Sequence, residues 1–325
     1  MKEVQFIKNN SERWREVELF LSKKTSIQDP DKLAELFIQL TDDLSYSKTF
    51  YPQSKTTQYL NTLASKIHQS VYKNKKEKRN RIITFWKYEL PEIFYQRRNE
   101  LIISFFVFFI AVVIGVISSE GDTGFVRLIL GDSYVNMTQE NIKNNDPLAV
   151  YKQMNGVDMF MGITFNNIRV SFYAFMAGLL LSVGTILLLL YNGIMLGTFH
   201  HLFYSQDLLF KSLSIIWIHG TLEISSIIIA GAAGLVLGNS ILFPKTYSRR
   251  QSFLLSAKDG VKIIVGLIPL FITAGFLESF VTRYTQMPIV LNLIIIISSL
   301  SFIIWYVIIY PIKLNRRENN ESTKN

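Results

Sequence analysis

The segment His219-Gly220-Thr221-Leu222-Glu223 holds the residue types best suited to chemistry in this chain. His219 and Glu223 are four residues apart, so they share one face of a helix. Glu223 lies near the start of a long apolar run, 224–237, and Glu278 lies near the end of another. A carboxyl group inside a bilayer is costly and must be paired, hydrated or protonated. These two acids therefore mark the first place to look for function.

Three interpretations of these side chains stay open. His219 and Glu223 could bind a metal, but two ligands fall short of the three that catalytic zinc sites usually have, and no His-Glu-x-x-His pattern exists. The acids could instead line a path for protons, ions or a polar lipid headgroup. In the third interpretation, which we favour, the polar side chains form a buried network that fixes helix packing.

The remaining sequence offers few other groups with chemical potential. Candidate partners for the two acids are Arg169, His200, His201 and Arg283. Cysteine is absent, and we find no nucleophile motif, phosphate-binding loop or nucleotide fingerprint. We therefore expect no catalytic residue, no cofactor and no metal, and an enzyme is the less favoured class.

The elements that must position these residues are helices in a membrane. The chain has 325 residues, 49% of them hydrophobic, and a mean hydropathy of +0.23. Residues 1–100 are polar and charged, whereas long apolar runs begin at Leu101. A bilayer is crossed by about 20 apolar residues in a helix. The predicted fold class is all-α: a polytopic helical membrane protein with about six transmembrane helices and a cytoplasmic helical N-terminal domain.

The apolar runs predict where these spans lie. The expected spans are about 101–119, 170–191, 192–205, 213–242, 261–280 and 289–310. The third is short and rich in glycine, so a re-entrant segment is the alternative. Between the first two spans, residues 157–168 are amphipathic, and we expect them to lie along the interface.

The distribution of lysine and arginine predicts the orientation. Residues 1–98 should form the cytoplasmic domain, 99–312 the helical membrane domain, and 313–325 a basic cytoplasmic tail. The loop 245–262 is also basic, whereas 120–169 has more acidic than basic residues and should face outward. These placements predict a multi-pass protein of the bacterial cytoplasmic (inner) membrane with both termini in the cytoplasm.

The positive charge favours membrane lipids as partners. The formal net charge is +9, and residues 1–100 carry 19 lysines and arginines against 13 acidic residues. Attraction to anionic lipid and the positive-inside bias explain this excess. No recognition motif accompanies the charge, so we expect no nucleic-acid partner.

Small residues recur every fourth position in three of the expected spans. Spacing of four places each set on one helix face and lets two backbones approach closely. We expect packing within one chain, and the alternative is the interface of a homo-oligomer. The helix-packing residues are Ala111, Gly115 and Ser119; Ala174, Gly178 and Ser182; and Ala230, Gly234 and Gly238.

Four segments together resemble the stage II sporulation protein M family of integral membrane proteins. The run HGTLEISSIIIAGAAGLVLGNSILFP at 219–244 is similar to its hallmark segment, and FNNIRVSFYAFMAGLLLSVGTILLLLYNGIMLG at 165–197 to its other membrane signature. LTDDLSYSKTFYP at 40–52 and FLESF at 276–280 resemble two more of its segments. By matching position, the resemblance implies a functional polar cluster of Asn166, Asn167, Asn192, Gly193, His219, Gly220, Glu223 and Glu278.

The resemblance also implies a class of function. The family's namesake works with two partners in a membrane-anchored machine that degrades peptidoglycan, and the partners perform the cleavage. Longer versions such as this chain look like the branch found beside MoxR-type ATPases, von Willebrand factor A-type domain proteins and RDD membrane proteins. We therefore expect a non-enzymatic membrane component that scaffolds or regulates an envelope-associated complex. The alternative is a transporter or lipid-handling protein that uses the embedded glutamate and histidine residues.

Overall fold

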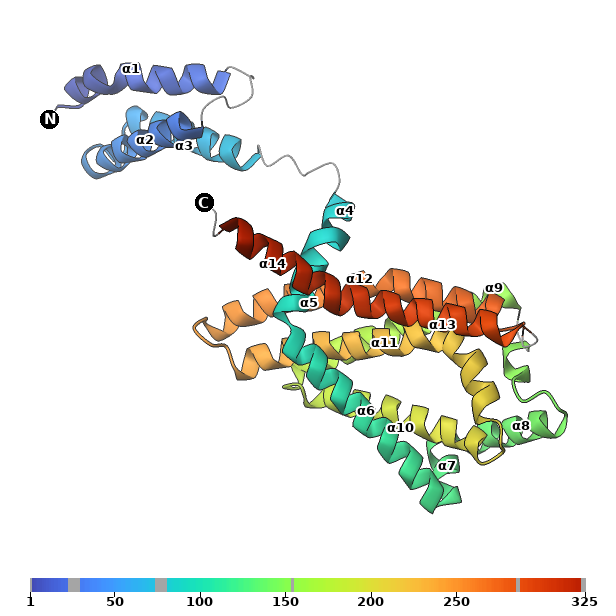
Figure 1. The fold of residues 1–325 in the computed structure, drawn as a ribbon. Helices are drawn as coiled ribbons and strands as arrows, with labels where there is room; N and C mark the ends of the chain where they lie inside the picture. The colour runs from blue at the N-terminus through green and yellow to red at the C-terminus, as the bar shows by residue number, and fades with distance from the viewer. Residues whose placement is uncertain (1, 23–29, 74–80, 153–154, 285–286, 323–325) are drawn as a thin grey trace. The chain divides into compact units, whose positions relative to one another are not determined.

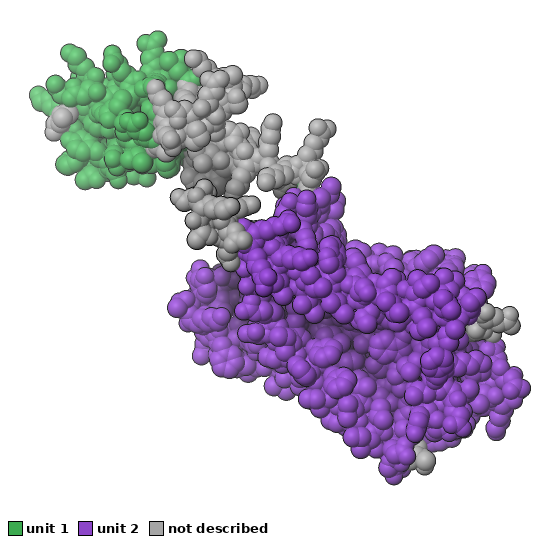
Figure 2. All heavy atoms as spheres, viewed as in Figure 1, with its two compact units in different colours: residues 1–81 green, residues 82–325 purple. Residues whose placement is uncertain are grey.

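The protein is helical throughout the part of the chain that can be described. The computed structural model describes residues 2–22, 30–73, 81–152, 155–284 and 287–322, and every regular element in these ranges is a helix. The chain divides into two compact units, residues 1–81 and residues 82–325 (Figure 2). Each unit has its own hydrophobic core.

Unit 1 is a set of three amphipathic helices around one core. They are α1 (Glu3–Ser22), α2 (Pro30–Phe50) and α3 (Lys55–Lys73) (Figure 1). The indole Nε1 of Trp14 donates a hydrogen bond of 2.9 Å to Asp43 Oδ2, which ties α1 to α2. The buried core residues recur at helical spacing on all three helices, as Phe6, Trp14, Val17, Leu36, Leu40, Leu44, Leu60, Leu63, Ala64 and Ile67.

Unit 2 contains the long apolar helices. Its elements are α4 (Arg81–Thr84), the π-helical turn η1 (Phe85–Glu89), α5 (Leu90–Gln96), α6 (Arg98–Gly121), α7 (Thr123–Leu130), α8 (Asp132–Lys143), η2 (Ala149–Lys152), α9 (Gly156–Met176), η3 (Ala177–Leu179), α10 (Val183–Tyr204), α11 (Leu209–Leu242), α12 (Arg249–Phe276), the π-helical turn η4 (Leu277–Val281), α13 (Ile289–Ile304), the π-helical turn η5 (Trp305–Ile309) and α14 (Tyr310–Ser322). Figure 1 shows the successive long helices α6, α9, α10, α11, α12 and α13 running alternately from one end of the unit to the other.

The predicted all-α membrane protein is confirmed. Five helical segments among the described residues are long and apolar enough to cross a membrane: Arg98–Gly121, Val183–Tyr204, Leu209–Leu242, Arg249–Val281 and Ile289–Arg317. Their outer faces expose large apolar side chains such as Phe106 (55%), Ile117 (66%) and Ile297 (60%). Water would make such a surface unstable, whereas lipid tails are a suitable solvent for it.

The predicted division of residues 170–205 into two spans is wrong. The first helix of this region, α9, begins at Gly156 and ends at Met176. It therefore includes residues 157–168, which we expected to lie along the interface. After η3 the backbone reverses through positive φ angles at Leu181 (53°) and Ser182 (68°). These left-handed residues stop the helix, and α10 then runs unbroken over residues 183–204. The glycine-rich piece 192–205 is therefore mostly the second half of α10.

Residues 82–98 belong to unit 2 and pack against its long helices. Leu90, Ile93 and Phe94 of α5 lie in the same core as Phe271 of α12. The Arg97 guanidinium donates to Asp259 Oδ2 at 2.6 Å, and Lys262 Nζ donates to Glu89 Oε2 at 2.8 Å. Both ion pairs join this segment to α12. The predicted boundary at residue 98 concerns the membrane surface and stays a prediction.

Candidate functional site

Three ionisable side chains that are far apart in the sequence meet inside unit 2. His219 and Glu223 project from α11, and Glu278 projects from η4. One ligand atom from each of the three lies within 4.8 Å of the other two. His219 Nε2 is 3.8 Å from Glu278 Oε1, and the two side chains are only 4% and 14% exposed. We call these three residues the acidic cluster.

The π-helical turn η4 sets the position of the third member. It follows α12 directly and holds Glu278 at its second residue. A π-turn widens the helix and often occurs at functional sites. Thr282, which caps this turn, is fully buried, and its Oγ1 is 3.0 Å from His219 Nδ1. The imidazole therefore contacts η4 through both of its ring nitrogens.

A third element, α9, supplies the partner of Glu223. Asn167 is buried, and its Nδ2 donates a hydrogen bond to Glu223 Oε1. Thr164 and Ser171 lie on the same face of α9, at three and four residues from Asn167, and both are buried. α9, α11 and η4 thus enclose the acidic cluster with polar side chains.

The electrostatics of this arrangement are unfavourable unless a positive charge joins it. Among the described residues, no lysine or arginine forms an ion pair with Glu223 or Glu278. Two carboxylates this close repel each other, and burial between apolar helices removes the water that would screen them. A proton or a bound cation would relieve both costs. The hydrogen bonds of the cluster resemble those of a packing network, and carboxylates in this place would attract a proton or a cation when ionised.

The other residues of the predicted polar cluster lie elsewhere. Asn166 is exposed on α9 and accepts a hydrogen bond of 3.1 Å from Arg169. Asn192 donates to Leu188 O within α10 at 2.8 Å. Gly193 packs against α6, where a Cβ would lie 2.6 Å from the Cβ of Ala111. These residues act on helix packing or on the surface rather than at the acidic cluster.

Gly220 lies between the two cluster residues of α11 but makes no close approach. A Cβ at this position would meet only Ile224 Cδ1 at 3.8 Å and Ile216 Cγ2 at 4.0 Å, which are ordinary contacts. The structure therefore has room for alanine at Gly220.

The histidines that the sequence offered as partners have other neighbours. His200 Nε2 accepts a hydrogen bond of 3.0 Å from the Trp217 indole. His201 Nε2 is 2.8 Å from Glu120 Oε2, at the end of α6. Thr282, in contrast, was missed by sequence reasoning. Its spacing of four residues from Glu278 is the signal that could have found it.

The small residues predicted for packing lie where helices cross within the chain. Gly115 faces the backbone of Ile194 on α10, and Gly178 faces the backbone of Gly234 on α11. A Cβ on Gly238 would lie 2.7 Å from Gly178 O. Ala111, Ala174 and Ala230 are also buried in these contacts. The backbones approach closely because no side chain intervenes.

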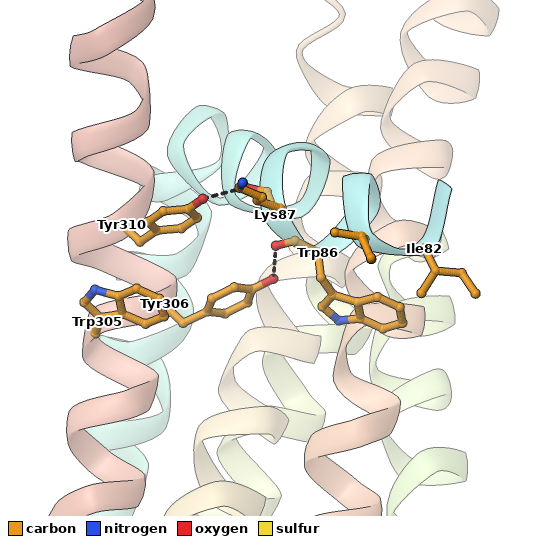
Figure 3. A pocket seen from close by; sticks show the side chains of 7 residues that line it. Ile82, Trp86, Lys87, Trp305, Tyr306 and Tyr310 are labelled. Carbon is orange, nitrogen blue, oxygen red and sulfur yellow. Dashed lines mark hydrogen bonds between the residues drawn. The ribbon is translucent and has the colours of Figure 1, made fainter. Parts of the chain in front are cut away.

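A separate pocket of about 410 Å³ lies where α4 and η1 meet η5 and α14. Figure 3 shows Tyr306 and Tyr310 pointing toward the backbone of η1. The Tyr306 hydroxyl donates to Trp86 O at 2.7 Å, and the Tyr310 hydroxyl donates to Lys87 O at 2.9 Å. The remaining lining residues, Ile82, Ile83 and Trp305, are apolar. Clusters of tyrosine and tryptophan side chains, such as those that line this pocket, are typical of a membrane–water interface.

Comparison with known proteins identifies two matching regions. The family model described as Stage II sporulation protein M matches residues 104–283, which is more than half of the chain and contains the whole acidic cluster. A domain of unknown function (DUF8413) matches residues 4–73, within unit 1. No curated protein and no solved structure matches the chain.

Proposed function

Because the chain belongs to the stage II sporulation protein M family, we propose that it is a non-enzymatic integral membrane component that scaffolds or regulates a complex at the cell envelope. The observation that carries this proposal is the combination of a membrane unit with a second compact unit. Unit 1 has its own core and its own family match, and we infer that it offers a surface for partners. Proteins of MoxR-ATPase-associated or other envelope complexes are the proposed partners.

Crosslinking in native membranes tests this function. The full chain should be recovered with partner proteins in a fixed stoichiometry after gentle solubilisation. A chain of residues 82–325 is the matched control, and it should insert in the membrane but lose the partners that unit 1 holds. Recovery of the full chain alone, with no crosslinked partner, would contradict the proposal.

The proposed topology has six passes in the bacterial cytoplasmic membrane, with both termini in the cytoplasm. Five of the passes are the long apolar segments given above. The additional pass is α9, the second in chain order, whose 21 residues span about 31 Å. The alternating direction of the long helices supports this count (Figure 1). The basic loop after α11 would then lie on the same side as Arg97 and Arg98, as the positive-inside rule favours.

Reporter fusions test the topology. A fusion near Asn145, after α8, should read as external, and one near Ser252, in the first turn of α12, should read as cytoplasmic. The opposite pair of results would reverse the orientation. Equal results at both sites would mean an even number of passes between them rather than three.

A second candidate function is supported by the acidic cluster itself. Buried ionisable groups between transmembrane helices commonly line a path for protons, ions or polar headgroups. If the chain is a transporter, Glu223→Gln should abolish a proton or cation flux in liposomes, because the amide cannot exchange a proton or neutralise a cation. Glu120→Gln, which changes a glutamate outside the cluster, should keep the flux. Equal flux in the wild type and Glu223→Gln would exclude this role for Glu223.

A further inference from the structure

We propose that His219, Glu223 and Glu278 form a binding site for one divalent transition-metal ion of the zinc class. This inference goes beyond the proposed scaffold function and does not depend on it. An imidazole nitrogen and two carboxylate oxygens are ligands that zinc commonly takes. The sequence alone showed two of these residues on one helix, and the fold brings the third, Glu278, to them.

The spacing of the three ligand atoms fits a shared ion better than a direct contact. His219 Nε2 and Glu278 Oε1 are 3.8 Å apart, which is too long for a hydrogen bond. Two ligands at about 2.1 Å from a tetrahedral zinc ion are about 3.4 Å apart. All three ligand atoms lie within 4.8 Å of one another, so rotations of the glutamate side chains would bring them to that spacing.

Two neighbouring polar side chains hold His219 and Glu223 in place, as in known metal sites. The other ring nitrogen of His219, Nδ1, is 3.0 Å from Thr282 Oγ1. In the tautomer in which Nδ1–H donates to this oxygen, Nε2 is the ring nitrogen that carries the lone pair a metal ion needs. Metal-binding histidines are usually oriented by such a bond. Asn167 Nδ2 likewise donates to Glu223 Oε1, which leaves the other carboxylate oxygen for an ion.

A buried hydroxyl group on the same face gives independent support. Ser226 lies three residues after Glu223 and seven after His219, so it shares their face of α11. It is fully buried, and its Oγ has no hydrogen-bond partner among the described residues. The neighbouring hydroxyls of Thr221 and Ser225 donate to carbonyls one turn earlier, to Trp217 O and Thr221 O. Buried hydroxyls are normally hydrogen-bonded, so this one marks a polar position, on the face of α11 that carries the cluster, that is open to a water or an ion.

The charge of the site selects a dication. Glu223 and Glu278 together carry two negative charges when ionised, and neither has a lysine or arginine ion-pair partner among the described residues. One divalent ion would neutralise both and would be held between α11 and η4. One imidazole with two carboxylates suits zinc and manganese, whereas calcium and magnesium favour sites made only of oxygen atoms.

Metal analysis of the full-length protein tests the site. Protein purified in detergent without chelator should contain about one zinc or manganese ion per chain. After removal of the ion with a chelator, titration with zinc chloride should restore one bound ion and raise the thermal unfolding temperature. His219→Ala and Glu278→Gln should each abolish stoichiometric binding. Thr282→Val and Asn167→Leu, which remove the side-chain contacts to His219 and Glu223, should weaken zinc binding by about 10-fold to 100-fold.

A matched pair of controls separates this site from other histidines and glutamates. His201→Ala and Glu120→Gln alter a pair that is 2.8 Å apart, with His201 in the last turn of α10, and both should bind zinc as the wild type does. If a cluster variant fails to fold, Glu278→Asp and the zinc-dependent shift of the wild-type unfolding temperature give the same test. Absence of bound metal together with no zinc-dependent shift would overturn the proposal. Zinc binding that is equal in the wild type and in all cluster variants would also overturn it.

Discussion

Gly178→Leu is expected to prevent the membrane unit from folding. A Cβ at Gly178 would fall on the carbonyl oxygen of Gly234, and a Cβ at Gly234 would fall on that of Ala174. The contact joins two backbones, so no side chain can rotate away to make room. Leucine would have to separate η3 from α11 along their whole crossing, which we expect to cost more than about 4 kcal/mol of the free energy of unfolding.

Gly162→Leu provides the matched control for this experiment. Gly162 lies on α9 and is exposed, and a Cβ built there meets no side chain and no neighbouring helix within 4 Å. Both variants should be compared by size-exclusion profile and thermal unfolding in the same detergent. Gly162→Leu should be monodisperse with a nearly unchanged midpoint. A monodisperse Gly178→Leu protein with the wild-type midpoint would show that this crossing does not hold the fold.

The positions of these glycines were predictable from spacing, but the break beside them was not. Four-residue spacing identified Gly178 and Gly234 because close backbone contact needs small residues on one face. The same spacing suggested that Ser182 continued the helix of Ala174. Residues 170–191 form one apolar run, so hydropathy gives no sign of the left-handed residues Leu181 and Ser182. The reversal there is stabilised by contacts with α11, since Ser182 Oγ donates to Asn239 Oδ1 at 3.3 Å.

The acidic cluster was predictable only in part, for a similar reason. Helical spacing placed His219 and Glu223 on one face, because both belong to one helix. Glu278 was predicted as a second acid embedded in an apolar run, and Asn167 entered the predicted set through family resemblance. Nothing in the sequence could show that either residue contacts α11. Their positions depend on how η4 and α9 pack, and the π-turn has no clear sequence signal. Tertiary packing therefore decides which of the predicted polar residues meet.

Leu60→Asp is expected to unfold unit 1 and leave unit 2 intact. Leu60 has no exposed surface and lies at the centre of the core formed by α1, α2 and α3. The substitution loses the burial of an apolar side chain, about 2 kcal/mol, and adds the larger cost of an unpaired carboxylate. Together these costs exceed about 5 kcal/mol, which is comparable with the whole stability of a domain of this size. Residues 1–81 expressed alone should therefore lose their cooperative unfolding transition in circular dichroism.

The exposed position Ile38 supplies the control, because it lies on α2 at 60% exposure. Ile38→Asp places the same charge in water and should change the stability of unit 1 by less than about 0.5 kcal/mol. In the full chain, limited proteolysis of Leu60→Asp should degrade residues 1–81 and leave a protected fragment that begins near Ile82. This outcome follows because the main core of unit 2 consists of residues from Leu90 onward. If both units became sensitive together, they would fold as one cooperative body, and the proposed role of unit 1 as a separate partner-binding domain would have to be abandoned.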